Sequence, residues 1–255
     1  MPHGTEFAFT SGGKGPATGD VLLVPLLAKP QPPLELVTRV DRVCDDAVSE
    51  LLSVRALRDE TGYAMHTTCG GTCRRVLVVS LGDAKKVSAH EIRKAASAAA
   101  RWIMTERLTS ATLWIDGLAT TGVERATAEW ALGMALAGFR FTGYKQPDEK
   151  IPAKVRVQIR SSESGHVHRV HPEVREAIII ANAVNYARAL AHEPANVINP
   201  ATLATVARNL VRGTKLKCRV FDAAQLRKLG MRGLLAVGQG AAHPASLIQI
   251  EYRGT

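Results

Sequence analysis

Histidine and cysteine are the residue types of this chain best suited to holding a metal, and they gather at His66, Cys69 and Cys73. Zinc sites usually pair two cysteines about two to four residues apart with a second pair of ligands elsewhere. The remaining cysteines, Cys44 and Cys218, stand isolated in the sequence. We therefore interpret these residues as structural and expect no metal there.

A second group consists of His166, His168 and His171. If this segment were a strand, His166 and His168 would share one face and could touch a single ion. Because no carboxylate stands nearby at a clear spacing, solvent-exposed histidines in a linker are the favoured interpretation.

Other catalytic patterns are incomplete or missing. Gly12-Gly13-Lys14 hints at a phosphate loop, but Ala8 and Gly15 stand where that motif needs a glycine and a Ser or Thr. The sequence contains neither Gly-x-Ser-x-Gly nor His-Glu-x-x-His. The residues alone predict no catalytic, cofactor-binding or metal-binding position in this chain.

The net charge of +10 belongs mainly to the C-terminal part of the chain. Residues 151–255 contain 15 Lys and Arg against 6 Asp and Glu, whereas residues 1–150 contain 18 against 17. A basic face can attract nucleic acid, so a nucleic-acid partner stays open. The favoured alternative is a basic half that packs beside an acidic one, because no run of Lys or Arg exceeds two residues. Trp102, Trp114 and Trp130 also fit apolar faces rather than a base-stacking surface.

The composition also bears on the compartment. Four cysteines in 255 residues are too few for a disulfide scaffold. The first residues lack a basic segment followed by an apolar run, and no apolar stretch approaches the roughly 20 residues that span a bilayer. We expect a cytoplasmic protein without a membrane segment.

The first 160 residues alternate between strand-like and helix-like segments. Short apolar runs predict strands at Thr5–Thr10, Asp20–Pro25, Arg75–Leu81, Ala111–Asp116 and Lys154–Arg160. Apolar residues at spacings of three and four predict a helix over Pro33–Leu57. Capping boxes at Ser88–Glu91 and Thr121–Glu124 predict helices to about Arg107 and through Ala137. This order indicates an α/β domain with a largely parallel sheet.

The later elements are sparser. Ser161–Gly165 is the best linker candidate, and Pro172 suits the start of a helix that runs to about His192. Further helices are predicted at Pro200–Leu210 and Ala223–Leu229, and strands at Lys215–Phe221 and Ser246–Tyr252. Residues 195–255 offer too few elements to enclose a core of their own.

The passage from Asn185 to Gly254 contains three distinctive pieces in a fixed order. They are Arg188…Pro194-Ala-Asn196…Pro200, Gly230-Met231…Leu235-Ala-Val-Gly-Gln-Gly240 and Leu247-Ile248…Glu251-Tyr252. Together they resemble the leucyl (cytosol) aminopeptidase family at the passage that leads into its catalytic domain. Residues 1–160 are more divergent and resemble the family mainly in plan.

The resemblance implies three parts: a macro-like N-terminal α/β domain over 1–165, a linker and connecting helix over 166–194, and the truncated start of an α/β metallopeptidase domain over 195–255. Members of the family are homohexamers that remove N-terminal amino acids from peptides. Their catalytic domain holds two divalent metal ions, Mn or Zn.

The family's metal ligands lie in segments resembling Val-Gly-Lys-Gly-x-Thr-Phe-Asp-Ser-Gly-Gly and Asn-Thr-Asp-Ala-Glu-Gly-Arg. Neither segment occurs in this sequence. We therefore expect these residues to bind no metal and to be inactive by themselves. Two alternatives stay open: a DNA-binding or regulatory protein, and a non-catalytic assembly subunit derived from the family.

Overall fold

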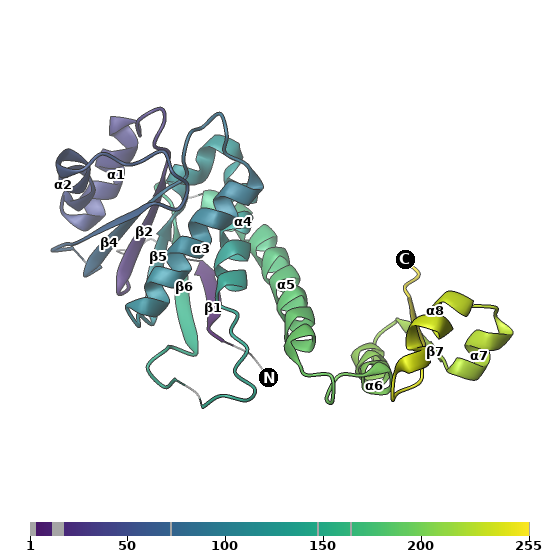
Figure 1. The fold of residues 1–255 in the computed structure, drawn as a ribbon. Helices are drawn as coiled ribbons and strands as arrows, with labels where there is room; N and C mark the ends of the chain where they lie inside the picture. Colours follow the sequence, from purple (N-terminus) through teal and green to yellow (C-terminus); the bar gives the residue numbers. More distant parts are fainter. Residues whose placement is uncertain (1–3, 12–17, 72, 147, 164, 255) are drawn as a thin grey trace. The chain divides into compact units, whose positions relative to one another are not determined.

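The computed structural model describes residues 4–11, 18–71, 73–146, 148–163 and 165–254, except for the side chains of 119–121. The chain divides into two compact units, Met1–Ala187 and Arg188–Thr255. Figure 1 shows a layered first unit with the sheet between helices, and a smaller second unit made of short elements.

The first unit is built on a six-stranded sheet with the order β1-β6-β5-β2-β4-β3. All neighbouring pairs are parallel except β3–β4. The predicted α/β fold with a largely parallel sheet is therefore confirmed, whereas the antiparallel edge strand β3 was not predicted. The strands are β1 (Glu6–Ser11), β2 (Val21–Leu26), β3 (Ala64–Thr68), β4 (Arg75–Ser80), β5 (Ser110–Trp114) and β6 (Lys154–Arg160).

Helices cover both faces of this sheet. On one face, α3 (Ala89–Thr105) and α4 (Val123–Ala137) enclose the larger core around Trp130, which is fully buried. On the other face, α1 (Leu34–Cys44) and α2 (Ala47–Val54) pack over β2 and β4. α5 (His166–His192) packs against α4 through Leu132, Ala177 and Ala181. Burial on both faces explains why β2 consists of apolar residues and proline throughout.

The single helix predicted over Pro33–Leu57 is wrong, because the chain breaks between α1 and α2. Asp45 and Asp46 adopt positive φ angles of 56° and 57°. The Asp41 carboxylate then accepts hydrogen bonds from the backbone N–H groups of Val48 and Ser49, at 3.0 and 3.3 Å. Asp45 and Asp46 tolerate the left-handed conformation, and the Asp41 carboxylate satisfies free N–H groups in the first turn of α2. The apolar spacing therefore continues across a break between two helices.

Two predicted helix starts also need correction. α4 begins after Gly122 as its N-cap, so Thr121 does not open a capping box. α5 begins at His166 and contains Pro172 in its interior, so the proline does not mark the start. The helix start predicted at Ser88 is confirmed, because Ser88 is the N-cap of α3 and its hydroxyl accepts a hydrogen bond from the Glu91 N–H at 3.4 Å.

The second unit has one helix layer against a two-stranded antiparallel sheet. Asn199 caps α6 (Pro200–Val211) with a capping box. β7 (Lys217–Phe221) pairs with β8 (Leu247–Glu251), and α7 (Ala223–Lys228), α8 (Arg232–Val237) and a short 3₁₀ turn (Gly238–Gly240) lie between them in the chain. Among the described residues of this unit, the buried apolar side chains are Ala204, Ala207 and Leu226.

Candidate functional site

A cluster of polar side chains lies where β5 and β6 end. The last residues of these parallel neighbours, Trp114 and Arg160, are register partners. Asp116 follows the first strand and Ser161 follows the second, so the topology brings them to the same edge of the sheet. The Ser161 hydroxyl donates to Asp116 Oδ1 at 2.5 Å. Asp116 Oδ2 accepts from the hydroxyl of Ser162 and, at 3.0 Å, from its backbone N–H.

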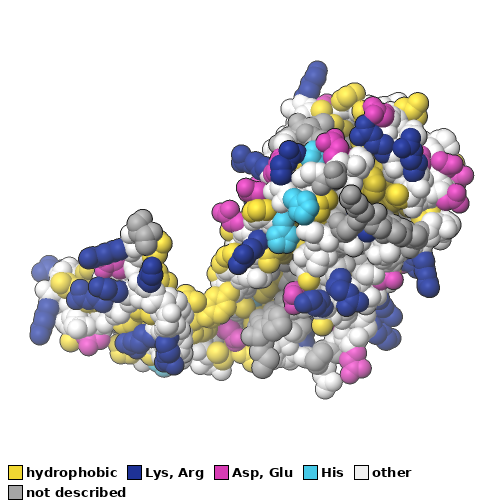
Figure 2. All heavy atoms as spheres, turned by 180° about the vertical axis from the view of Figure 1, so that it is seen from behind, with side chains coloured by type: hydrophobic (Ala, Val, Ile, Leu, Met, Phe, Trp, Pro, Cys, Tyr) yellow, Lys and Arg dark blue, Asp and Glu magenta, His cyan; other side chains and the backbone are white. Residues whose placement is uncertain are grey.

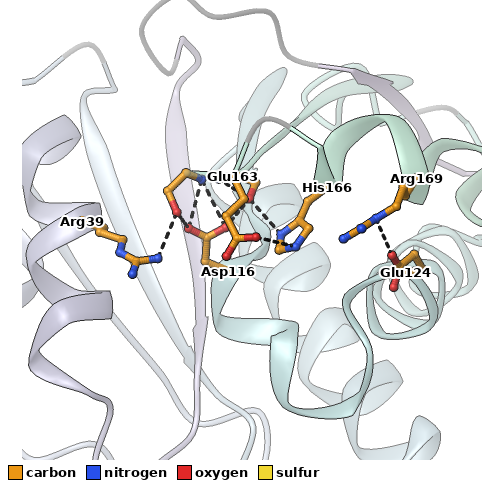
Figure 3. A network of polar contacts seen from close by, with 8 residues as sticks. Arg39, Asp116, Glu124, Glu163, His166 and Arg169 are labelled. Atoms are coloured by element: carbon orange, nitrogen blue, oxygen red, sulfur yellow. Dashed lines mark hydrogen bonds and ion pairs between the residues drawn. The ribbon is translucent and has the colours of Figure 1, made fainter.

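His166, the first residue of α5, extends this cluster. Its Nδ1 lies 3.3 Å from Ser161 Oγ, and its Nε2 lies 2.9 Å from Glu163 Oε2. The imidazole is only 13% exposed, whereas the Glu163 side chain is 60% exposed. The chain therefore places a carboxylate, an imidazole and a hydroxyl in series within a single turn (Figure 3).

Two arginines stand at the ends of the cluster. Arg39 of α1 donates to the Ser162 hydroxyl at 3.4 Å and forms an ion pair with Glu35. Arg169 of α5 forms an ion pair with Glu124 of α4 at 2.8 Å. Figure 3 shows both guanidinium groups directed toward this turn. The network therefore joins α1, α5 and the ends of two strands, and the separate Arg169–Glu124 pair joins α5 to α4.

A carboxylate, an imidazole and a hydroxyl in series suggest a serine nucleophile, but the hydrogen bonds do not support that chemistry. A nucleophilic serine must give its proton to the imidazole. Here the Ser161 proton is directed to Asp116, and Ser161 Oγ also accepts from the Glu163 backbone N–H at 3.1 Å. The hydroxyl is held by three partners, so the arrangement anchors the turn between β6 and α5.

Sequence reasoning missed Asp116, Ser161 and Glu163 as members of one cluster. Asp116 ends a predicted strand and Ser161 directly follows another, which is the available signal. Polar residues after parallel strands meet at one edge of the sheet when those strands are neighbours. The neighbour relation of β5 and β6, however, depends on strand order, which local patterns do not specify.

The structure also places the histidines and cysteines that the sequence singled out. His166, His168 and His171 lie on a helix rather than a strand. His168 and His171 are exposed as expected, whereas His166 is mostly buried. The expectation for His166 was wrong because its ring packs between Ser161 and Glu163.

Cys44 is not isolated in the fold, in contrast to its place in the sequence. It shares a buried cluster with Cys73, and Cys69 packs against that cluster. Burial raises the pKa of the Cys44 thiol to about 12 and that of Cys73 to about 11, and it also raises the pKa of Cys69. Since the thiolate is the reactive form, these residues are suited to packing.

The described residues contain no group of three or more His, Cys, Asp or Glu side chains placed to hold a metal ion. Neither the cluster around Cys69 nor the one around His166 forms such a site. A centre that holds two metal ions therefore does not fit the described residues.

The surface of the second unit is both apolar and basic. Residues 188–255 contain ten Lys and Arg against three Asp and Glu, and Figure 2 shows dark blue side chains gathered on this unit. An open hollow of about 520 Å³ is lined in part by Arg227 and Arg232. Large apolar side chains are also exposed, among them Val237 at 89%, Leu229 at 55% and Ile250 at 45%.

Comparison with known families gives two matches in chain order. Residues 24–148 match the N-terminal domain of the cytosol aminopeptidase family, and residues 185–255 match its catalytic domain. The chain belongs to the cytosol aminopeptidase family. The resemblance seen in the sequence is thereby confirmed.

Individual relatives agree with this assignment. The chain is 34% identical over 190 residues to a probable cytosol aminopeptidase of Aquifex aeolicus, covering 73% of this chain and 36% of that protein. It is 28% identical over 257 residues to a probable cytosol aminopeptidase of Sinorhizobium fredii, covering 100% of this chain and 50% of the relative. The chain thus spans about half or less of the length of these relatives.

Solved structures show the same fold. A mutant of tomato leucine aminopeptidase aligns over 98% of this chain and 51% of its own, with a TM-score of 0.76 and 18% identity. The bottromycin maturation enzyme BotP aligns over 92% of this chain and 46% of its own, with a TM-score of 0.70 and 22% identity. A structure of BotP in complex with Mn also matches.

No helix among the described residues combines the length and apolar character needed to cross a bilayer.

Proposed function

We propose that this chain serves a metal-dependent aminopeptidase that removes N-terminal amino acids from peptides, as its N-terminal domain and the first part of its catalytic domain. The observation that carries the proposal is the pair of family matches, 24–148 and 185–255, in the order of the family's two domains. The proposed parts are 1–165, the connecting segment 166–194, and the start of the catalytic domain at 195.

The two parts have different tasks in this proposal. The first unit has a core on both faces of its sheet and is proposed to act as a folded domain. The second unit contributes a two-stranded antiparallel sheet and short helices as an initial layer of the catalytic domain. Its exposed apolar side chains support this role, because exposed apolar patches mark surfaces that associate with further protein.

Two divalent ions, Mn or Zn, would supply the hydrolytic chemistry by polarising the scissile carbonyl and activating water. The described residues do not fit such a centre. The proposed division of labour therefore assigns peptide hydrolysis to residues beyond these 255, with assembly into a hexamer in the cytoplasm. By themselves these residues are proposed to be inactive.

A peptidase assay tests this proposal. Purified 1–255 is incubated with a leucine-based chromogenic substrate, with and without Mn or Zn, beside the full-length Aquifex aeolicus relative as a positive control. The expected result is no metal-dependent turnover by 1–255 under conditions in which the relative is active. Turnover that follows the 1–255 peak through successive columns would overturn the proposal.

A second candidate function is nucleic-acid binding, favoured by the ten basic residues against three acidic ones in 188–255. Contacts to phosphates would make such binding fall steeply with salt. A titration of labelled duplex DNA at low and physiological salt, repeated with Arg227→Ala and Arg232→Ala, separates this function from that of a non-catalytic assembly subunit. The subunit would instead co-purify with a full-length relative.

A further inference from the structure

The open hollow of about 520 Å³ in the second unit combines two arginines with a lining made mainly of small side chains. Arg227 comes from the last turn of α7 and Arg232 from the start of α8 (Figure 1). The loop over 241–245 forms another wall and packs against the end of α8, since a Cβ added at Gly238 would lie 2.8 Å from Ala245 Cβ. The hollow is therefore built within this unit alone.

The side chains of both arginines form no hydrogen bond or ion pair with any residue that the structure describes. Two acidic residues of the same unit are engaged elsewhere: Asp222 accepts from the Gln225 N–H as the cap of α7, and Glu251 pairs with Arg253 at 2.7 Å. A guanidinium group carries N–H donors in a fork that matches a carboxylate. The hollow thus offers donors to an anionic group from outside the unit.

The lining favours a protein segment over nucleic acid as the source of that group. The described residues that line the hollow are alanines, glycine, proline and leucine besides the polar ones, and they include no aromatic ring on which a base could stack. The same helix, α8, also exposes Leu234 and Val237. Protein interfaces combine such apolar surface with arginine, whereas contacts to phosphates need only exposed charge.

We propose that this hollow is a docking site for an acidic, apolar segment of the remainder of the catalytic domain, with Arg227 and Arg232 as its carboxylate anchors. The inference rests on the proposed function, because it takes the partner from the part of a cytosol aminopeptidase that this chain does not match. The match covers 36% of the Aquifex aeolicus relative and 50% of the Sinorhizobium fredii relative. Asp or Glu side chains of the segment bind at the arginines, and its apolar side chains fill the hollow.

A peptide array tests the docking site. Overlapping short peptides cover the part of the Aquifex aeolicus relative that follows the region aligned with this chain, and labelled 1–255 is applied at physiological salt. Each peptide that binds is also made with Asn and Gln in place of Asp and Glu. Affinities are then measured by fluorescence titration, and circular dichroism checks that every variant retains the wild-type fold.

The expected result is binding to peptides that combine Asp or Glu with apolar residues, and weaker binding of their amide versions. Arg227→Ala and Arg232→Ala should each weaken binding about five- to thirtyfold, the range of an interface anchor. Ala242→Trp, which fills the hollow without a change of charge, should weaken it to a similar extent. Arg208→Ala removes the same charge from α6, outside the hollow, and should change binding less than about twofold because salt screens distant charges.

Three outcomes would overturn the docking site and leave the proposed function standing. They are binding that persists in Arg232→Ala and Ala242→Trp, binding that falls equally in Arg208→Ala, and displacement of the peptides by duplex DNA. Absence of binding to every peptide would also overturn the docking site. The proposed function fails separately, through metal-dependent turnover by 1–255 in the peptidase assay.

Discussion

The two units of this chain differ in how completely they bury their own apolar surface. In the first unit, α1 to α4 cover both faces of a six-stranded sheet, and Trp130, Leu77 and Leu113 are fully buried. In the second unit, Leu226 is the one large apolar side chain that is fully buried among the described residues, whereas Val237 and Tyr252 are 89% and 68% exposed. Similar local patterns thus give a well-buried core in one case and a unit with many exposed apolar side chains in the other.

The largest expected effect comes from truncating a side chain in the closed core. Trp130→Ala removes a fully buried ring packed between α4 and the sheet. We expect it to lower the free energy of unfolding of the first unit by about 3–5 kcal/mol. Val237→Ala in the second unit should change stability by less than about 0.5 kcal/mol, because that side chain is already in solvent. Urea denaturation followed by circular dichroism measures both, and equal losses would remove the contrast.

Glycine-to-alanine changes in two helices sharpen the comparison further. An added Cβ at Gly133 of α4 would lie 2.6 Å from the Arg93 carbonyl oxygen of α3, so Gly133→Ala should cost about 1–3 kcal/mol. At Gly233 of α8 nothing lies within 4 Å, so Gly233→Ala should stabilise its helix by up to about 1 kcal/mol. Thermal melts of the two variants should therefore shift in opposite directions. A gain at Gly133 would contradict the close approach of α3 and α4.

A smaller effect is expected at the other end of the sheet, where Asp20 holds the start of β5. Its carboxylate accepts from the backbone N–H and hydroxyl groups of Thr109 and Ser110, at 2.8–3.3 Å. Partial burial acts to raise the pKa of Asp20, but these hydrogen bonds outweigh it and leave the pKa below its usual value.

Because the folded pKa of Asp20 is depressed, its contribution is present above the unfolded value near 3.9 and is lost as the pH falls through the folded value. Asp20→Asn should cost about 0.5–1 kcal/mol at neutral pH, and less below about pH 4. Denaturation at several pH values checks this. A variant as destabilised at pH 3 as at pH 7 would show that the carboxylate charge does not matter.

The sequence predicted most elements of the first unit because their apolar runs and spacings reflect burial directly. It failed where a local interaction overrides periodicity, as at Asp45 and Asp46, and at β3, whose mixed residues lie at an edge. The polar cluster could not be predicted, because Asp116 and Ser161 meet only through the order of β5 and β6 in the sheet. That these 255 residues include no catalytic residue stays a prediction, which the peptidase assay tests.

The measurement that tests the central contrast most directly is native-state hydrogen exchange of the full chain, comparing β2 with β8. Local stability follows burial, so amides of a buried central strand exchange only through global unfolding. We predict that amides within Val21–Leu26 are at least about a hundredfold more protected than those within Leu247–Glu251. Equal protection in the two strands would contradict the account, because it would mean that the second unit is as complete as the first.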